Sequence, residues 1–328
     1  MRIAIVGAGG VGGVIAGLLA RAGGAQVVVV ARGAHGEAIR RDGLRVEGPG
    51  GPFTVRVDVV EDPAAAGPAD AALVAVKAWQ VAEVAPRLAP VLGARGVAVP
   101  LQNGVEAADR LAAALGDERV AGGLVAVLAW IERPGVVRLA GGTPRLRVGE
   151  RGSRGRSAPV LRGGGEGGSA RLEALAAAMR GAGIAVDVVA DVEAATWEKF
   201  LLVEPWGSVA AAARAPWGVV RSVPETRALH LAAMEELAAV ARARGVGIAA
   251  DAEARTLAFL DGVLPEATAS MQRDLGAGRP SELDDQTGAV VRLAREARVP
   301  APVHEHLYAA LAPQERAARG RIPPFART

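Results

Sequence analysis

Cysteine is absent from this 328-residue chain, and aromatic residues make up only 3% of it. The first absence excludes disulfide bridges, thiol nucleophiles and cysteine-ligated metal sites. The second requires aliphatic cores, which a composition that is 51% hydrophobic can supply. Among the four histidines, only His304-x-His306 has a close spacing. We expect that pair to lie on a solvated helix face, and we predict no metal site.

Lysine is almost absent as well, since only Lys77 and Lys199 occur beside thirty-six arginines. Arginine stays protonated at any accessible pH, whereas a lysine ammonium group can lose and regain a proton when its surroundings lower its pKa. The two lysines are therefore candidates for chemical roles, such as proton transfer, that arginine cannot perform.

Net charge and long apolar runs are also scarce. The formal net charge is +3, and no basic run is interleaved with aromatic residues, so nucleic-acid binding is not indicated. The apolar run at residues 3–6 is followed by glycines and is too short for a signal peptide or a membrane span. We expect a cytoplasmic protein that binds neither nucleic acid nor a membrane.

The N-terminus, in contrast, carries a clear pattern. An apolar run at residues 2–6 precedes Gly7-Ala8-Gly9-Gly10-Val11-Gly12, and a helical pattern at 14–22 leads to a β-branched run at 26–31. The motif G-x-G-x-x-G thus lies between a strand and a helix in a βαβ unit of about thirty residues, the context of a dinucleotide-binding fold. The uniformly apolar second run is typical of a parallel strand covered on both faces.

Each glycine of this motif has a predicted role. Gly7 permits the tight turn, Gly9 lets the backbone approach a pyrophosphate, and Gly12 allows close packing of helix on strand. Together with Gly10 they are candidate cofactor-binding residues, because a helix N-terminus offers backbone N–H groups to phosphates.

The end of the second strand predicts the type of dinucleotide. An acid there would bind a ribose 2′-hydroxyl group, whereas an arginine suits a 2′-phosphate. The strand ends Val30-Ala31-Arg32, and no acid follows before Glu37. Arg32 can pair bidentately with a phosphate, so NADPH is the predicted cofactor.

The rest of the first half continues the alternation of strands and helices. Strand patterns occupy residues 71–76, 96–100 and 120–130, with helical stretches at 79–90 and 105–115 between them. Short strands and turns follow over 133–149. The Gly/Arg/Ser-rich residues 150–170 are predicted to form a flexible surface loop.

From about residue 190 the strand pattern gives way to Ala/Leu-rich helical patterns, at residues 192–213, 224–244, 251–261, 282–298 and 303–312. We therefore predict an α/β chain of two domains. Residues 1–190 form a Rossmann-type, doubly wound NADPH-binding domain, and residues 191–328 form an all-helical substrate domain.

Rare polar residues follow two of the predicted strands. Lys77 comes directly after one strand, and Gln102-Asn103-Gly104 follows the next. Residues just beyond the carboxyl ends of parallel strands line the crevice in which an open α/β sheet binds ligands. Asn-Gly is also a common turn dipeptide, but Asn103 is the only asparagine in the chain. Lys77 and Asn103 are therefore candidate substrate- and cofactor-binding residues.

Lys199 lies in Trp197-Glu198-Lys199-Phe200, on an apolar helical pattern. Burial lowers the pKa of a lysine toward neutrality. Such a lysine can act as a general acid and protonate the alkoxide that forms when hydride reaches a ketone. Lys199 is thus the candidate proton donor.

The motifs named so far resemble those of the ketopantoate reductases, or 2-dehydropantoate 2-reductases. The resemblance rests on G-x-G-x-x-G from residue 7, K-A-W-Q at 77–80 and Q-N-G at 102–104, with a similar segment at 32–46. It implies that Arg32 meets the NADPH 2′-phosphate. It also implies that Lys77 and Asn103 lie near the nicotinamide and the substrate.

The second half extends the resemblance. W-x-K at 197–199 is similar to the family's catalytic lysine motif, which implies that Lys199 is the proton donor. Ser270-Met271-Gln272-Arg273-Asp274 and Glu282-Leu283-Asp284 are similar to a further family segment. By that likeness Ser270 binds the substrate carboxylate, and Glu282 orients Lys199 or the substrate hydroxyl groups. Taken alone, Glu282 is typical of an acid at a helix N-terminus after a Pro-Ser cap.

One departure affects the substrate. The family pattern places asparagines four and eight residues after the catalytic lysine, on one helical face. This chain has Val203 and Gly207 there, and Pro205 between them predicts a kink. Polar groups of a substrate would find fewer partners at such a site.

Three functions remain as hypotheses. The leading one is NADPH-dependent reduction of a 2-oxo acid to a 2-hydroxy acid, with ketopantoate as the first candidate substrate. A second is a divergent paralogue that reduces another ketone or an imine, as opine-type dehydrogenases do. A third is an NADPH-binding protein without catalysis. The apolar helical domain also makes a homodimer plausible.

Overall fold

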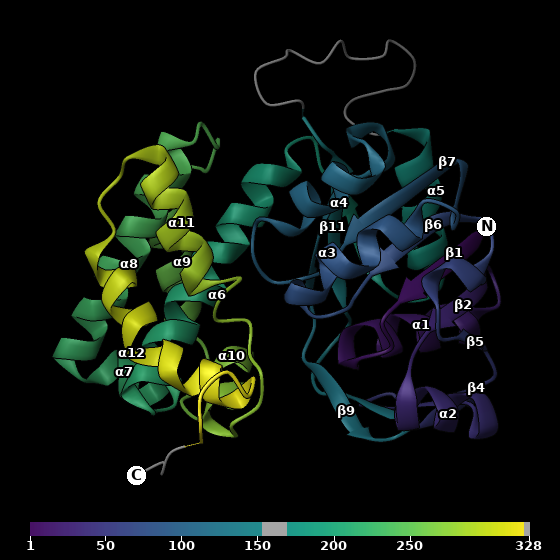
Figure 1. Cartoon of the computed structure of the whole chain (residues 1–328), viewed down its shortest axis with the longest axis horizontal. Helices are drawn as coiled ribbons and strands as arrows, with labels where there is room; N and C mark the ends of the chain where they lie inside the picture. The colour runs from purple at the N-terminus through teal and green to yellow at the C-terminus, as the bar shows by residue number, and fades with distance from the viewer. Residues whose placement is uncertain (153–168, 325–328) are drawn as a thin grey trace. The chain divides into compact units, whose positions relative to one another are not determined.

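The computed structural model describes residues 1–152 and 169–324. The chain divides into two compact units, and each consists of two stretches of sequence (Figure 1). Met1–Gln102 and Ala107–Val192 form the first unit, while Asn103–Glu106 and Glu193–Thr328 form the second. Most of the loop predicted over 150–170 lies outside the described residues.

A parallel five-stranded sheet in the order β5-β2-β1-β6-β7 is the centre of the first unit. Its strands are β1 (Arg2–Val6), β2 (Gln26–Val30), β5 (Asp58–Val60), β6 (Ala69–Val74) and β7 (Leu92–Pro100). Sequence neighbours on β1 point to opposite faces, because side chains alternate along a strand. Ile3 and Ile5 belong to one hydrophobic cluster, and Ala4 and Val6 belong to another.

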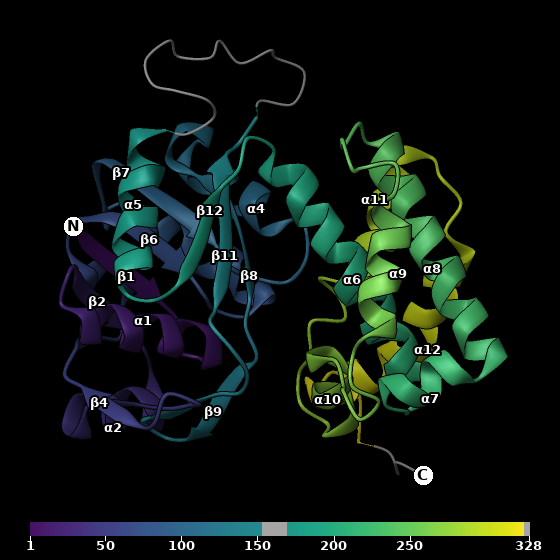
Figure 2. The same ribbon diagram turned by 180° about the vertical axis from the view of Figure 1, so that it is seen from behind.

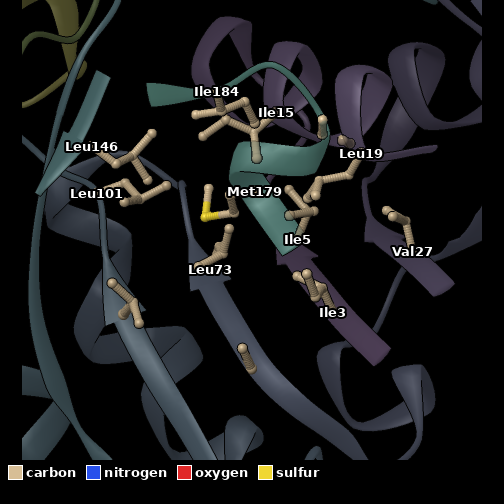
Figure 3. Packing of buried hydrophobic residues seen from close by; sticks show 14 of the residues in the cluster. Ile3, Ile5, Ile15, Leu19, Val27, Leu73, Leu101, Leu146, Met179 and Ile184 are labelled. Carbon is tan, nitrogen blue, oxygen red and sulfur yellow. The ribbon is translucent and has the colours of Figure 1, made fainter. Parts of the chain in front are cut away.

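Helices cover both faces of this sheet. Against Ile3 and Ile5 pack α1 (Gly10–Ala22) and α5 (Ala170–Gly181), and Figure 3 shows Ile15, Leu19 and Met179 from these helices above the strands. The other face packs against α3 (Val81–Val84) and α4 (Ala107–Leu115). Figure 2 shows α1 and α5 on the near side. The predicted doubly wound fold is thus confirmed, and the all-apolar strands follow from burial on both faces.

Two smaller sheets and further short helices complete the first unit. One sheet has the order β4-β3-β10-β9 and the other β12-β11-β8. Their strands are β3 (Leu44–Glu47), β4 (Phe53–Val55), β8 (Ala121–Ala126), β9 (Ala129–Arg133), β10 (Val136–Leu139), β11 (Arg145–Glu150) and β12 (Ala185–Val188). The helical segments are α2 (Gly33–Asp42), η1 (Pro63–Ala66), η2 (Ala78–Gln80), η3 (Ala85–Leu88) and η4 (Asp117–Arg119).

The prediction of one strand over 120–130 in the central sheet was wrong. β8 pairs with β11, whereas β9 pairs with β10 in another sheet. Only an isolated parallel bridge between Ala98 and Val120 links this segment to β7. The whole segment is apolar, so its composition carries no sign of the point at which the chain changes partners.

The second unit is helical, as predicted. Its helices are α6 (Val192–Ala213), α7 (Trp217–Ser222), α8 (Pro224–Ala243), α9 (Ala252–Asp261), α10 (Ser270–Gly276), α11 (Thr287–Ala297) and α12 (Pro302–Ala318). Pro205 does not end α6, which continues to Ala213. In this stretch the Ser208 hydroxyl donates to the carbonyl oxygen of Glu204 over 3.0 Å.

No helix in the described part of the chain is long and apolar enough to cross a membrane. Within the same residues, no three His, Cys, Asp or Glu side chains are grouped as metal ligands.

The prediction of a solvated His304 was also wrong, since its side chain is fully buried. Its Nε2 lies 2.9 Å from Glu204 Oε2, and its Nδ1 lies 2.7 Å from Glu236 Oε2. Glu236 also accepts the backbone N–H groups of Val303 and His304. The two acids come from α6 and α8, so the spacing of the histidines alone could not reveal them.

This triad sets the charge of His304. Burial acts to lower the pKa of the imidazole, but the charge of Glu204 and the hydrogen bonds to both carboxylates outweigh it and raise the pKa to about 9. His304 is therefore protonated in the folded protein at neutral pH, and one cation joins helices α6, α8 and α12.

The His304 triad predicts a pH-dependent stability of the helical unit. Its folded-state pKa of about 9 exceeds the ordinary 6.5, so the stabilisation is complete below the ordinary pKa and is lost as the pH rises through about 9. The loss should be on the order of 3 kcal/mol. Urea unfolding followed by tryptophan fluorescence should show the first part of this loss between pH 6.5 and about 8, below the range in which deprotonation of Lys199 acts in the opposite sense. His304→Gln should remove the loss over that range.

The exposed His306 on the same helix provides the control, so His306→Gln should keep the wild-type profile. A His304→Gln protein that still loses stability as steeply as wild type between these pH values would contradict the assignment.

Candidate functional site

The glycine-rich turn between β1 and α1 contains two glycines that the protein's own packing requires. Gly7 has a φ of 103°, and a Cβ atom there would lie 2.8 Å from the backbone nitrogen of Val76. At Gly12 a Cβ atom would lie 2.0 Å from the carbonyl oxygen of Gly7. These glycines permit the tight turn and the close approach of α1, the roles that the sequence predicts.

Gly10 and Gly9 differ in what surrounds them. A Cβ atom on Gly10 would lie 2.4 Å from the carbonyl oxygen of Ala129, so β9 runs directly against the first turn of α1. Gly9 has an ordinary φ of −59°, and no heavy atom lies within 4 Å of the Cβ position. Neither backbone strain nor internal packing explains a glycine there. The open space instead suits a molecule that approaches from outside.

The N-terminus of α1 has the electrostatics of an anion site. No side chain caps it, and its first turn carries no acidic residue. The first N–H groups of a helix lack partners within the helix, and the helix dipole favours a negative group beside them. With the open position at Gly9, the turn fits the pyrophosphate of a dinucleotide.

Arg32 occupies the N-cap position of α2, directly after the second strand. Its side chain is 53% exposed, and its Nη1 lies 3.6 Å from Glu83 Oε1. An exposed pair at that distance contributes little to stability, so a phosphate can displace Glu83 at small cost.

Lys77 lies just beyond the carboxyl end of β6 and is exposed. Its backbone N–H donates to Gln80 Oε1 over 3.2 Å, and its Nζ lies 5.8 Å from the centre of the Trp79 ring. The sequence indicated no role for Gln102, whose buried Nε2 donates to the carbonyl oxygens of Val74 and Val76 over 2.8 Å each. Gln102 thereby fixes the backbone that leads to Lys77. The only signal for it was its position beside Asn103.

Asn103 and Lys199 are joined in the second unit. Lys199 Nζ donates to Asn103 Oδ1 over 2.8 Å. The segment that carries Asn103 is anchored by Gly104, whose φ is 111° and whose Cβ position lies 2.9 Å from the carbonyl oxygen of Asp285. Two residues further on, Glu106 accepts from Arg292 over 2.7 Å. The Asn103 side chain is thus held by Lys199, and the backbone that follows it is held by the contacts of Gly104 and Glu106.

The surroundings of Lys199 change its acidity. Burial lowers the pKa of its amine to about 8, and the negative charge of Glu282 partly opposes this. Glu282 is itself buried and accepts from Gln286 Nε2 over 3.3 Å. A lysine of this pKa is mostly protonated at neutral pH and gives up its proton more readily than an exposed lysine does.

The sequence suggested that Glu282 lies at a helix N-terminus, but the structure does not place it there. α11 begins at Thr287, and residues 282–286 form a turn in which the Glu282 carbonyl accepts the N–H groups of Asp285 and Gln286. Tertiary packing brings the Glu282 side chain near enough for its charge to act on Lys199. The Pro-Ser pair before Glu282 gives no indication of this packing.

Ser270 stands apart from this group. It is exposed as the first residue of α10. The neighbouring Ala269 and Met271 face α6 at Gly207, where a Cβ atom would lie 3.2 Å from Met271 Cε. Gly207 is two helical turns beyond Lys199, about 12 Å along the axis. The structure therefore groups Asn103, Lys199 and Glu282, whereas Ser270 lies on α10, beside the part of α6 around Gly207.

Family models match both halves of the chain. The model described as ketopantoate reductase PanE/ApbA matches residues 3–153, and that of the C-terminal part of the same reductase matches residues 191–315. A 2-dehydropantoate 2-reductase of Mesorhizobium japonicum is 30% identical over 92% of this chain and 94% of its own length. One from Halobacterium salinarum is 31% identical over 92% of this chain and 95% of its own.

A solved structure agrees with these sequence relationships. The PanE/ApbA family ketopantoate reductase of Ralstonia eutropha JMP134 superposes with a TM-score of 0.85 at 31% identity. The match covers 97% of this chain and the whole of that one.

The open position at Gly9 predicts that substitutions there affect ligand binding alone. Gly9→Ala should weaken binding of a nicotinamide dinucleotide by at least about tenfold, because the methyl group occupies the space of the pyrophosphate. Its melting temperature should stay that of wild type. Dissociation constants from fluorescence titration and melting curves measure both effects.

Two other glycines calibrate this test. Gly24 also has nothing within 4 Å of its Cβ position but lies beyond the far end of α1, so Gly24→Ala should change neither quantity. Gly12→Ala should lower the melting temperature, because of its contact with Gly7. Unaltered dinucleotide binding by Gly9→Ala would show that the space has another purpose.

Proposed function

The chain belongs to the ketopantoate reductase family, and we propose that it reduces a 2-oxo acid to a 2-hydroxy acid with NADPH, ketopantoate being the leading substrate. The observation that carries the proposal is the buried Lys199, which donates to Asn103 and has a pKa lowered to about 8. A general acid of this kind is what the reduction of a ketone needs.

A nicotinamide dinucleotide, when bound, would supply the hydride for the carbonyl carbon, and the carbonyl oxygen would take up the displaced electron pair. Lys199 donates a proton from Nζ to that oxygen, which completes the hydroxyl group, and regains a proton from water. Asn103 Oδ1 holds the ammonium group in one orientation. Glu282 supplies a negative charge that favours the protonated lysine before transfer.

The preference for NADPH rests on Arg32. Its exposed side chain follows the second strand and forms a long ion pair with Glu83. A 2′-phosphate would offer it a doubly charged partner and short, charge-assisted hydrogen bonds. Lys77 adds a second exposed cation beyond β6, on the other side of β1 in the sheet.

A second candidate function follows from the face of α6 that carries Lys199. One turn beyond it, the half-buried Val203 packs against the aliphatic core, and after another turn Gly207 presents no side chain. Neither Val203 nor Gly207 offers a hydrogen bond to the distal polar groups of a substrate. A ketone or imine with an apolar substituent is therefore the alternative substrate.

The role of Lys199 predicts a steep loss of turnover on substitution. Lys199→Arg and Lys199→Met should each lower kcat by about a hundredfold or more, because neither side chain can supply a proton at neutral pH. The wild-type kcat should fall as the pH rises through about 8, where Lys199 loses its proton. Steady-state assays over pH test both statements.

Unchanged dinucleotide affinity and a cooperative unfolding transition must accompany the loss, since a protein that has lost its fold would show neither. Near-normal turnover of the Lys199→Arg protein would contradict the acid role.

The substrate and the cofactor can be tested with one panel. In a panel of ketopantoate, pyruvate, 2-oxoisovalerate and an imine-forming pair, NADPH oxidation should be fastest with ketopantoate. The enzyme should also prefer NADPH to NADH. Arg32→Ala should reduce that preference by about tenfold. The equally exposed Arg40 on the same helix gives the control Arg40→Ala, which should keep it. Faster turnover of an apolar 2-oxo acid or an imine would favour the second candidate.

A further inference from the structure

His35 makes two hydrogen bonds that lie outside the roles assigned so far. Its Nε2 is 2.9 Å from the carbonyl oxygen of Ala8, within the glycine-rich turn. The backbone N–H of Gly135, in the turn between β9 and β10, donates to its Nδ1 over 3.1 Å. One half-buried side chain on α2 thus joins two segments far apart in the sequence.

These partners determine the protonation of the ring. The backbone N–H of Gly135 can only donate, so Nδ1 accepts and carries no proton. The carbonyl oxygen of Ala8 can only accept, so Nε2 carries the proton. His35 is therefore a neutral imidazole of one defined tautomer in this arrangement.

The contact with Ala8 fixes the orientation of one peptide group. The described chain has no cis peptide bonds, and in a planar trans peptide the C=O and N–H bonds point in opposite directions. With its carbonyl oxygen held toward His35, the Ala8–Gly9 peptide directs the Gly9 N–H to the opposite side. A flip of this peptide would present a negative carbonyl oxygen there instead, and glycine resists such a flip least.

The contact with Gly135 supports the ring from behind. Gly135 is held in turn by Arg45, whose backbone N–H donates to its carbonyl oxygen over 3.0 Å. The same hairpin touches the turn directly, since Ala129 of β9 packs against Gly10. The orientation of the turn thus depends on the hairpin through His35 as well as through Gly10.

We propose that His35 is a positioning residue for dinucleotide binding, which holds the Ala8–Gly9 peptide with its N–H group toward the pyrophosphate. The inference rests on the proposed function only in requiring that the chain binds a nicotinamide dinucleotide. His35 acts through the backbone of the turn and needs no contact with the cofactor.

A neutral ring is a condition of this role. Burial lowers the pKa of His35, and the hydrogen bond to Ala8 partly opposes the shift. No acidic or basic side chain contributes to it. Near His35 on α2, Arg32 pairs with Glu83, and Glu37 is exposed. Near Gly135 in the hairpin, Arg133 pairs with Glu47, and Glu132 pairs with Arg138.

The sign of the pH effect follows from this lowered pKa. The ring is neutral at and above the ordinary pKa of 6.5. As the pH falls below that value toward the lowered pKa, Nδ1 gains a proton and can no longer accept from Gly135. Dinucleotide affinity should therefore decline on the acid side.

Two substitutions separate the two contacts. A glutamine amide places its nitrogen near the position of Nε2, so His35→Gln keeps a donor for Ala8. An asparagine amide reaches only the position of Nδ1, so His35→Asn keeps an acceptor for Gly135 and loses the bond to Ala8.

The measured quantities are the dissociation constants of NADH and NADPH between about pH 5.5 and 8, and the melting temperature. NADH is essential, because the 2′-phosphate of NADPH itself titrates near pH 6.

We expect His35→Asn to weaken NADH binding by about tenfold and His35→Gln to bind within about threefold of wild type. Wild type should lose affinity for NADH as the pH falls below 6.5, and His35→Gln should not. Equal binding by His35→Asn and wild type would overturn the proposal, as would an acid-side loss that persists in His35→Gln. A wild-type protein that binds neither dinucleotide would overturn it together with the proposed function, so the two failures are distinguishable.

Discussion

The hydrogen bond between Lys199 and Asn103 joins residues 96 positions apart in the chain. A lysine removed from water needs a polar partner, because an isolated buried ammonium group is costly. Several features of the helical unit supply or support that partner. Gly104 allows the backbone beside Asn103 to approach Asp285, Glu106 is tied to α11 by Arg292, and Glu282 lies buried nearby. The same burial lowers the lysine pKa, so the stability of the unit and the proposed chemistry depend on one contact.

The sequence alone predicted much of this arrangement where the signal is local. G-x-G-x-x-G between two apolar runs predicted the turn, and a largely apolar helical pattern predicted the burial of Lys199. It failed where partners come from distant segments. His304 was expected to be solvated, but acids on two other helices surround it. Gln102 and His35 were missed because their partners are backbone groups, which have no signature in composition.

The two faces of α6 divide the polar residues of that helix. Lys199, Val203 and Gly207 follow one another at intervals of four, and beyond the lysine this face is apolar. The neighbouring rows contain Glu204 and Ser208, both fully buried, and Glu204 interacts with His304. Glu204 and Ser208 thus make their hydrogen bonds within the helical unit. Under the proposed function, hydrogen bonds to the distal polar groups of a substrate would have to come from residues other than Val203 and Gly207.

The four residues Asn103–Glu106 interrupt the first unit and pack as part of the second. The chain therefore changes units three times, although its sequence pattern suggests a single change near residue 190. This has a consequence for modular recombination within the family. A chimaera assembled by one crossover near residue 190 would combine the lysine of one parent with the asparagine loop of the other. A helical module that keeps both Lys199 and Asn103 from one parent has to be transplanted as two pieces, residues 103–106 and the stretch from residue 193.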